Sequence, residues 1–166
     1  MKKQYFISLA ITCMVLFNVK AQNTPIDDFL KRYPSLEGVT SVTLSQQMLK
    51  SMFSTSNLNN PDAYSSLSVY KTDIPVNLFT DFRNILLSSK YEQSMEVNKE
   101  NSIKLSYFLK EVSKNTNEIV IIRQKKYSFS AIYIRGNIDV NLLDNYLRVI
   151  KISLDQRMQT GQTFVQ

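Results

Sequence analysis

Residues 119–134 read IVIIRQKKYSFSAIYI. The two ends of this stretch, residues 119–122 and 129–134, are dense in β-branched and aromatic side chains, which favour β-strands. The polar run Arg123-Gln124-Lys125-Lys126 between them is typical of the tip of a hairpin. The stretch therefore predicts two antiparallel strands joined by a short turn.

Two segments before this hairpin extend the prediction to a sheet. Residues 91–97 alternate, and a strand here would place on one side Tyr91, Gln93, Met95 and Val97. Residues 103–112 fit a strand and a helix equally well, because apolar residues recur at both periods. We expect a strand, since it would complete a meander with its neighbours.

The first half of the chain interleaves helices with strands. Thr24, followed by Pro25 and Asp27, forms a helix-start pattern, and apolar residues at helical spacing continue to Tyr33. Residues 39–44 alternate and predict a strand. A second helix is expected from Ser45 to Phe53, a loop over residues 54–62, a strand over 66–70 and a helix over 75–87.

The last predicted strand ends at Gly136, after which Asp139 is placed to cap a final helix. Apolar residues at helical spacing line one face of this helix from Leu143 to Leu154. Together the elements predict an α+β fold: a single domain with a mostly antiparallel sheet, a meander in its second half, packed by three to four helices.

The N-terminus has the pattern of a signal peptide: a basic start, an apolar run over residues 5–19, and the cleavage motif Val19-Lys20-Ala21. The apolar run continues past Cys13, which argues against lipid attachment there, and it is shorter than the roughly 20 residues of a membrane span. We expect cleavage near Ala21 and export to the periplasm or the cell exterior. The expected organisation is a signal peptide over residues 1–21, one domain over 22–155 and a flexible tail over 156–166.

The composition of the mature chain excludes several chemistries. Cleavage would remove the single cysteine, and the sequence has no histidine, so disulfides, thiolate metal sites and a Ser-His-Asp triad are ruled out. Three lysines leave with the signal, which lowers the formal charge from +6 to +3. We expect no catalytic residues, no cofactor, no metal, no nucleic-acid partner and no transmembrane segment in the mature chain, whose oligomeric state the sequence leaves open.

Four short motifs carry a resemblance to a known family. They are Gly38-Val39-Thr40-Ser41-Val42, Leu67-Ser68-Val69-Tyr70, Lys90-Tyr91-Glu92 and Gly136-Asn137-Ile138-Asp139. Through them the chain resembles the DUF4252 family, exported proteins of Bacteroidetes without an established activity, from about Ile26 to Ile150. The resemblance implies no catalytic residues that could be transferred to this chain.

Three sets of residues are candidate sites. The carboxylates Asp27 and Asp28, with Glu37 beyond, and the pair Asp139 and Asp144 could be imagined in acid-base work, but their places at helix starts favour capping and dipole roles. Basic residues at and near the hairpin tip are candidate contacts to an anionic partner, although a solvated tip explains them as well. They are Arg123, Lys125 and Lys126, with Lys104, Lys110, Lys114 and Arg135 in neighbouring elements.

The third set, Tyr127, Phe129 and Tyr133, shares one side of a strand and could stack on a sugar or a peptide, while packing in the core is the commoner role. The sequence favours an exported, non-catalytic binding or interaction module whose partner is an unknown envelope protein or an anionic envelope surface. The alternatives are a component of an envelope signalling circuit and a glycan hydrolase that uses only carboxylates.

Overall fold

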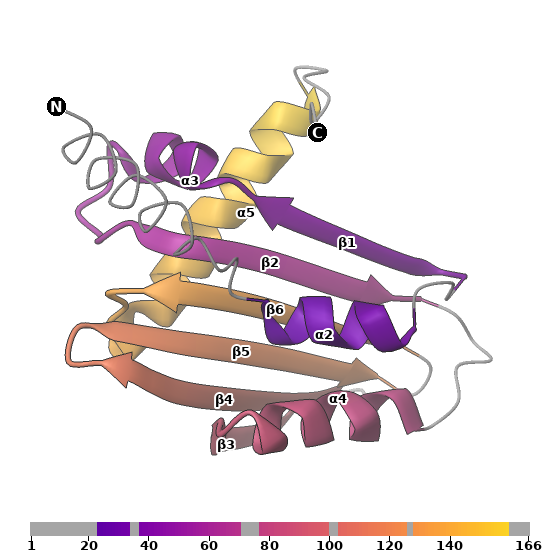
Figure 1. The fold of residues 1–166 in the computed structure, drawn as a ribbon. Coiled ribbons are helices and arrows are strands. Elements are labelled where there is room, and N and C mark those ends of the chain that lie inside the picture. The colour runs from indigo at the N-terminus through magenta and orange to yellow at the C-terminus, as the bar shows by residue number, and fades with distance from the viewer. Residues whose placement is uncertain (1–22, 34–36, 71–76, 100–102, 126–127, 160–166) are drawn as a thin grey trace, which may run out of the picture.

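The computed structural model describes residues 23–33, 37–70, 77–99, 103–125 and 128–159. Within them the chain forms one six-stranded antiparallel sheet in the order β1-β2-β6-β5-β4-β3 (Figure 1). The strands are β1 (Val39–Leu44), β2 (Pro61–Val69), β3 (Glu92–Lys99), β4 (Ile103–Ser113), β5 (Thr116–Lys125) and β6 (Ser128–Gly136). The helices are α2 (Pro25–Arg32), α3 (Gln46–Phe53), α4 (Asn77–Ser88), the 3-10 helix η1 (Val140–Leu142) and α5 (Leu143–Gln159). The predicted single α+β domain is confirmed, and β3 to β6 form the expected meander.

Helices cover both faces of the sheet. Figure 1 shows α2 and α4 in front of the strands and α5 crossing behind them. The core under α2 and α4 is built on the aromatic side chains Phe29, Phe82, Phe108 and Phe129. The second core, under α3 and α5, contains Phe53, Tyr146, Ile119, Ile121 and Ile134. Strand β5 contributes to both cores, which explains why residues 119–122 are apolar without alternation.

The helix starts follow the sequence pattern. Oγ1 of Thr24 accepts a 3.1 Å hydrogen bond from the backbone N–H of Asp27, and Oδ2 of Asp27 accepts one of 2.9 Å from the backbone N–H of Thr24. This reciprocal capping box begins α2 as predicted. Ser45 caps α3 by a single bond, because its hydroxyl accepts from the Met48 N–H at 3.3 Å.

Residues 103–113, which the periodicity left ambiguous, form β4. Tertiary pairing decides this, because β4 lies between β3 and β5 and can bond to a strand on each side. Its alternate residues Ser106 and Phe108 are buried under the α4 face. The expectation of a strand is confirmed.

Two strand predictions needed correction. β2 begins at Pro61, inside the segment expected to be a loop, and Pro can open a strand because the first residue needs no ladder donor there. In β3 the register shifts between Gln93 and Met95. Gln93 therefore faces the α4 side, where Tyr91 also belongs to the core, opposite Met95 and Val97. The prediction that these four residues share one side is wrong.

The remaining differences are in element ends. Strand β5 continues through Arg123 and Gln124 to Lys125, so these residues are not the hairpin tip; residues 126–127 lie outside the described residues. Helix α5 extends to Gln159, into the segment expected to be a flexible tail, and residues 160–166 lie outside the description. The expected signal peptide and Pro75 also lie outside it. Among the described helices, none has the length and apolar character needed to cross a bilayer.

Gly136 joins the last strand to the final helix at the point where β6 meets the start of β2. Its φ is +149°, and a Cβ atom built there would lie 2.9 Å from the Cα of Pro61 and 3.0 Å from the backbone nitrogen of Asp62. Only glycine fits so close a backbone approach in this conformation. Gly136, predicted as the residue that ends the strand, is therefore also a close packing contact between β6 and β2.

Candidate functional site

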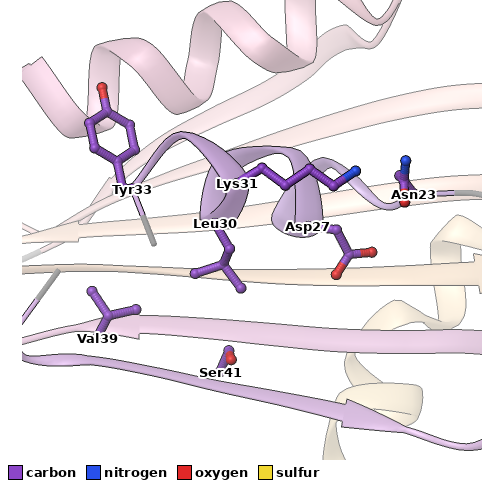
Figure 2. Close-up of a pocket in the computed structure, with 7 residues that line it drawn as sticks. All are labelled: Asn23, Asp27, Leu30, Lys31, Tyr33, Val39 and Ser41. Carbon is purple, nitrogen blue, oxygen red and sulfur yellow. The ribbon is translucent and has the colours of Figure 1, made fainter. Parts of the chain in front are cut away.

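A groove of about 690 Å³ lies on the surface between α2 and the edge strand β1. Figure 2 shows Leu30 directed from the helix towards Ser41 on the strand, with Tyr33 near the Val39 end. The lining combines apolar and polar side chains. The lining residues are Asn23, Asp27, Leu30, Lys31, Tyr33, Val39 and Ser41.

The alternation of β1 places one set of its side chains in the groove. Val39 and Ser41 pair with Val69 and Leu67 of β2, and both of these partners belong to the core under α2. Side chains of directly paired residues lie on the same face, so Val39 and Ser41 also face α2. The floor of the groove is thus set by strand register and its wall by α2.

The position of Tyr33 at the groove is held by α4. Its hydroxyl donates a hydrogen bond to Oδ2 of Asp81. This bond to a carboxylate raises the pKa of Tyr33, and burial adds to the effect. The phenol therefore stays neutral at physiological pH and fixes the end of α2 against α4.

The candidate carboxylates of the helix starts have structural partners. Asp27 belongs to the capping box, and Asp28 accepts from Nζ of Lys31 at 3.3 Å. Asp139 accepts from the backbone N–H of Asn141 at 2.9 Å, and Asp144 lies exposed in the first turn of α5. Glu37 is exposed before β1. The described residues contain no cluster of three acidic side chains that could hold a metal ion.

A second pocket, of about 320 Å³, lies on the same face of the sheet beyond the end of α4. At its base the hydroxyl of Tyr91 donates a 2.6 Å hydrogen bond to Oε2 of Glu118. Nζ of Lys110 lies 3.8 Å from the same oxygen and 5.2 Å from the centre of the Tyr91 ring. The lining residues are Asn23, Pro25, Asp28, Ser89, Tyr91, Lys110, Val112 and Glu118.

The environment of Glu118 keeps two phenols neutral. Burial is the main cause that raises the pKa of Tyr91, and the hydrogen bond to Glu118 and the charge of that carboxylate raise it further. Burial and the Glu118 charge likewise raise the pKa of Tyr133, whereas nearby Arg135 lowers it. Both phenols therefore stay protonated near neutral pH.

The sequence alone did not single out Glu118, although a signal was present. Lys110, Glu118 and Arg135 occupy directly paired positions on β4, β5 and β6. An acidic residue directly between two basic residues on neighbouring strands would have marked Glu118 as a candidate. This pattern becomes visible only when the strand register is known. Without the register, Glu118 is one acid in a strand.

The basic residues do not form one strip. Arg123 and Lys125 are exposed on the α3 and α5 side of β5, whereas Lys104 and Lys110 face the other side. Lys104 is paired with Glu96 at 2.9 Å. Lys126 lies outside the described residues, so a contact of Arg123, Lys125 and Lys126 with an anionic partner stays a prediction.

Of the candidate aromatic residues Tyr127, Phe129 and Tyr133, the two that the structure describes are part of the core. Phe129 and Tyr133 are only 5% and 3% exposed. The ring of Phe129 meets that of Phe29 at 5.8 Å in an edge-on arrangement, and α2 and α4 cover this face. Two of the three residues therefore cannot receive a ligand, and Tyr127 lies outside the described residues.

The model of a family described as a domain of unknown function, DUF4252, matches residues 33–146, more than half of the chain. The chain belongs to this family. The DUF4252 match confirms the resemblance seen in the strand and turn motifs, and it includes all six strands and the Tyr91–Glu118 pair.

Two further comparisons add little to the DUF4252 assignment. A search of curated proteins finds no match. The crystal structure of a protein of unknown function from Pseudomonas aeruginosa, PA94, is similar at 8% identity and a TM-score of 0.35, over 80% of this chain and 87% of that chain. A TM-score this low supports no argument about fold or function.

Proposed function

We propose that this DUF4252 protein is an exported envelope protein that binds another envelope component and catalyses no reaction. The observation that carries the proposal is the groove between α2 and β1, whose lining combines apolar side chains with the polar groups of Asn23, Lys31 and Ser41. Such a lining suits binding of a partner segment, since apolar surface supplies affinity and a few polar groups orient the ligand.

Export rests on the sequence of residues 1–21 and is tested by the mass of the protein recovered from the cell envelope. Processing near Ala21 predicts a mature chain that begins at Gln22 and carries no acyl group. An intact Met1, or a lipid on Cys13, would contradict export in this form.

Binding at the groove is tested by site-specific photo-crosslinking in intact cells. A photoreactive residue at Lys31, on the groove, should give a covalent product with another envelope component. The matched control is the same replacement at Lys151, which is exposed on α5 against the opposite face of the sheet. Products that mass spectrometry finds equally at both positions, or only from a second copy of this chain, would remove the proposal.

A carboxylate-only hydrolase is the second candidate, and one observation favours it. Asp28 and Glu118 both line the second pocket, and two carboxylates are the minimum that glycoside hydrolysis needs. Both already have partners, Lys31 for Asp28, and Tyr91 and Lys110 for Glu118. We therefore expect no new reducing ends when the purified protein is incubated with envelope polysaccharides. Release by the wild type that is lost in Glu118→Gln would favour the hydrolase.

Membership in an envelope signalling circuit is the remaining alternative. The identity of neighbouring genes tests it directly, because a sigma or anti-sigma factor next to this gene would favour signalling.

A further inference from the structure

The two edges of the sheet differ. The outer strand β3 carries the charged residues Glu92 and Glu96, and its register shifts between Gln93 and Met95. Charges and bulges of this kind prevent an edge strand from pairing with another chain. The opposite edge strand, β1, has the sequence VTSVTL, without a charge, a proline or a register shift.

The backbone groups on the outer side of β1 can be identified from the register. The N–H of Tyr70 donates to the carbonyl of Gly38, so these two residues form a hydrogen-bonded pair. Such pairs alternate along antiparallel strands, and Thr40, Val42 and Leu44 are therefore the residues that bond to β2. Val39, Ser41 and Thr43 direct their N–H and C=O groups away from the sheet. Among the described residues, no strand pairs with this side of β1.

We propose that β1 pairs with β1 of a second copy of this chain, antiparallel about a two-fold axis at Ser41. In this register Ser41 faces Ser41 of the partner, and Val39 faces Thr43. All three outward residues of each strand then find partners, which no other two-fold register achieves. An interface with two-fold symmetry must be complementary to itself, and an uncharged strand meets this condition.

The charges of α2 suit the same arrangement. The first turn of α2 is acidic, with Asp27 and Asp28, and the last turn is basic, with Lys31 and Arg32. The two-fold axis makes the two α2 helices antiparallel. The acidic first turn of one helix is therefore at the same end of the interface as the basic last turn of the other. The helix carries no net charge from these four residues, and the two copies meet without repulsion.

The grooves of both copies border this edge, as Figure 2 shows for one of them. Pairing would join them into one channel between the two α2 helices, over a continuous sheet of twelve strands, twice the six of one chain. A six-residue strand edge is smaller than the standard interface of about 800 Å² per partner, so we expect a weak dimer whose population rises with concentration.

The test uses protein purified from cells that export it, studied by sedimentation equilibrium up to millimolar concentration. We expect a monomer–dimer equilibrium for the wild type. Ser41→Lys and Ser41→Glu should each weaken the dimer at least tenfold, because like charges then face each other on the axis. An equimolar mixture of the two variants should restore a dimer, which native mass spectrometry identifies as the mixed species.

The matched control is Ser94→Lys, a replacement of an exposed serine on the other edge strand, which should leave the dimer unchanged. Ser41 is exposed, so the variants should fold, and circular dichroism checks that they do. A wild type that stays monomeric throughout, or a dimer that Ser41→Lys does not weaken, overturns the proposal. Either result leaves the proposed function open, because that proposal is decided by whether Lys31 gives a product with another envelope component, and not by whether the chain forms a dimer.

Discussion

The hydroxyl of Tyr91 donates a 2.6 Å hydrogen bond to Oε2 of Glu118, and the two residues are only 4% and 9% exposed. This contact links the end of α4 to the middle of the sheet. A buried acceptor that loses its donor keeps its desolvation cost. Loss of this hydrogen bond is therefore expected to lower the stability of the fold.

Tyr91→Phe removes this donor and keeps the ring. We expect the free energy of unfolding to fall by about 1–2 kcal/mol, because the Glu118 carboxylate stays buried with one partner fewer. Urea denaturation followed by circular dichroism measures it. Tyr70→Phe is the control, since Tyr70 is 70% exposed and its hydroxyl should contribute little. Equal effects of the two substitutions would contradict the buried bond.

The raised pKa of Tyr91 predicts how stability depends on alkaline pH. In the unfolded chain a tyrosine loses its proton near pH 10.0, whereas folded Tyr91 keeps it. The unfolded state then binds fewer protons, so the free energy of unfolding falls as pH rises above 10, by up to about 1.4 kcal/mol per pH unit for each such group.

Tyr133 should contribute in the same direction, since its pKa is also raised by burial. Denaturation curves between pH 8 and 11 measure the decline, which should be shallower in Tyr91→Phe than in the wild type. Parallel declines would show that Tyr91 ionises alike in both states.

Gly136→Ala tests the close approach of β6 to β2. The new methyl group would lie 2.9 Å from the Cα of Pro61, and the φ of +149° is strained for alanine. We expect a loss of about 2–3 kcal/mol in the free energy of unfolding. Gly38→Ala serves as the comparison, because its φ of +80° is strained without such an overlap, and about 1 kcal/mol is expected. A smaller loss at Gly136 than at Gly38 would be inconsistent with this contact.

Thr24→Ala tests the capping box of α2, which accounts for the position of Asp27 beside the groove. Loss of the side-chain acceptor for the Asp27 N–H should lower the free energy of unfolding by about 1 kcal/mol. The matched replacement Thr80→Ala, at an exposed position inside α4, should leave stability unchanged or slightly higher, since alanine favours the helix. Thermal unfolding of both variants distinguishes a cap from a general effect of losing threonine.

Most helices and strands were predictable because their signals are local. The Thr24 box, the Ser45 cap and the alternation of residues 39–44 all lie within a few positions of the elements that they define. The ends of elements were less predictable. Pro61 has the local pattern of a loop, and only pairing with Gly136 makes it the start of a strand.

The candidate sites depended on information that is not local. Phe129 and Tyr133 form a regular aromatic side of a strand, and the sequence does not state that two helices cover it. Arg123 and Lys104 are close in the predicted sheet, but alternation and register place them on opposite faces. Side-chain position on a face depends on register, and a shift of one residue reverses it.

The sequence by itself determined the kind of domain: which segments form helices or strands, and where most of them begin. Tertiary structure decided what lies together, because antiparallel pairing joins residues that are far apart in the chain. It placed Glu118 beside Tyr91, set the groove between α2 and β1, and left the uncharged β1 at one edge of the sheet.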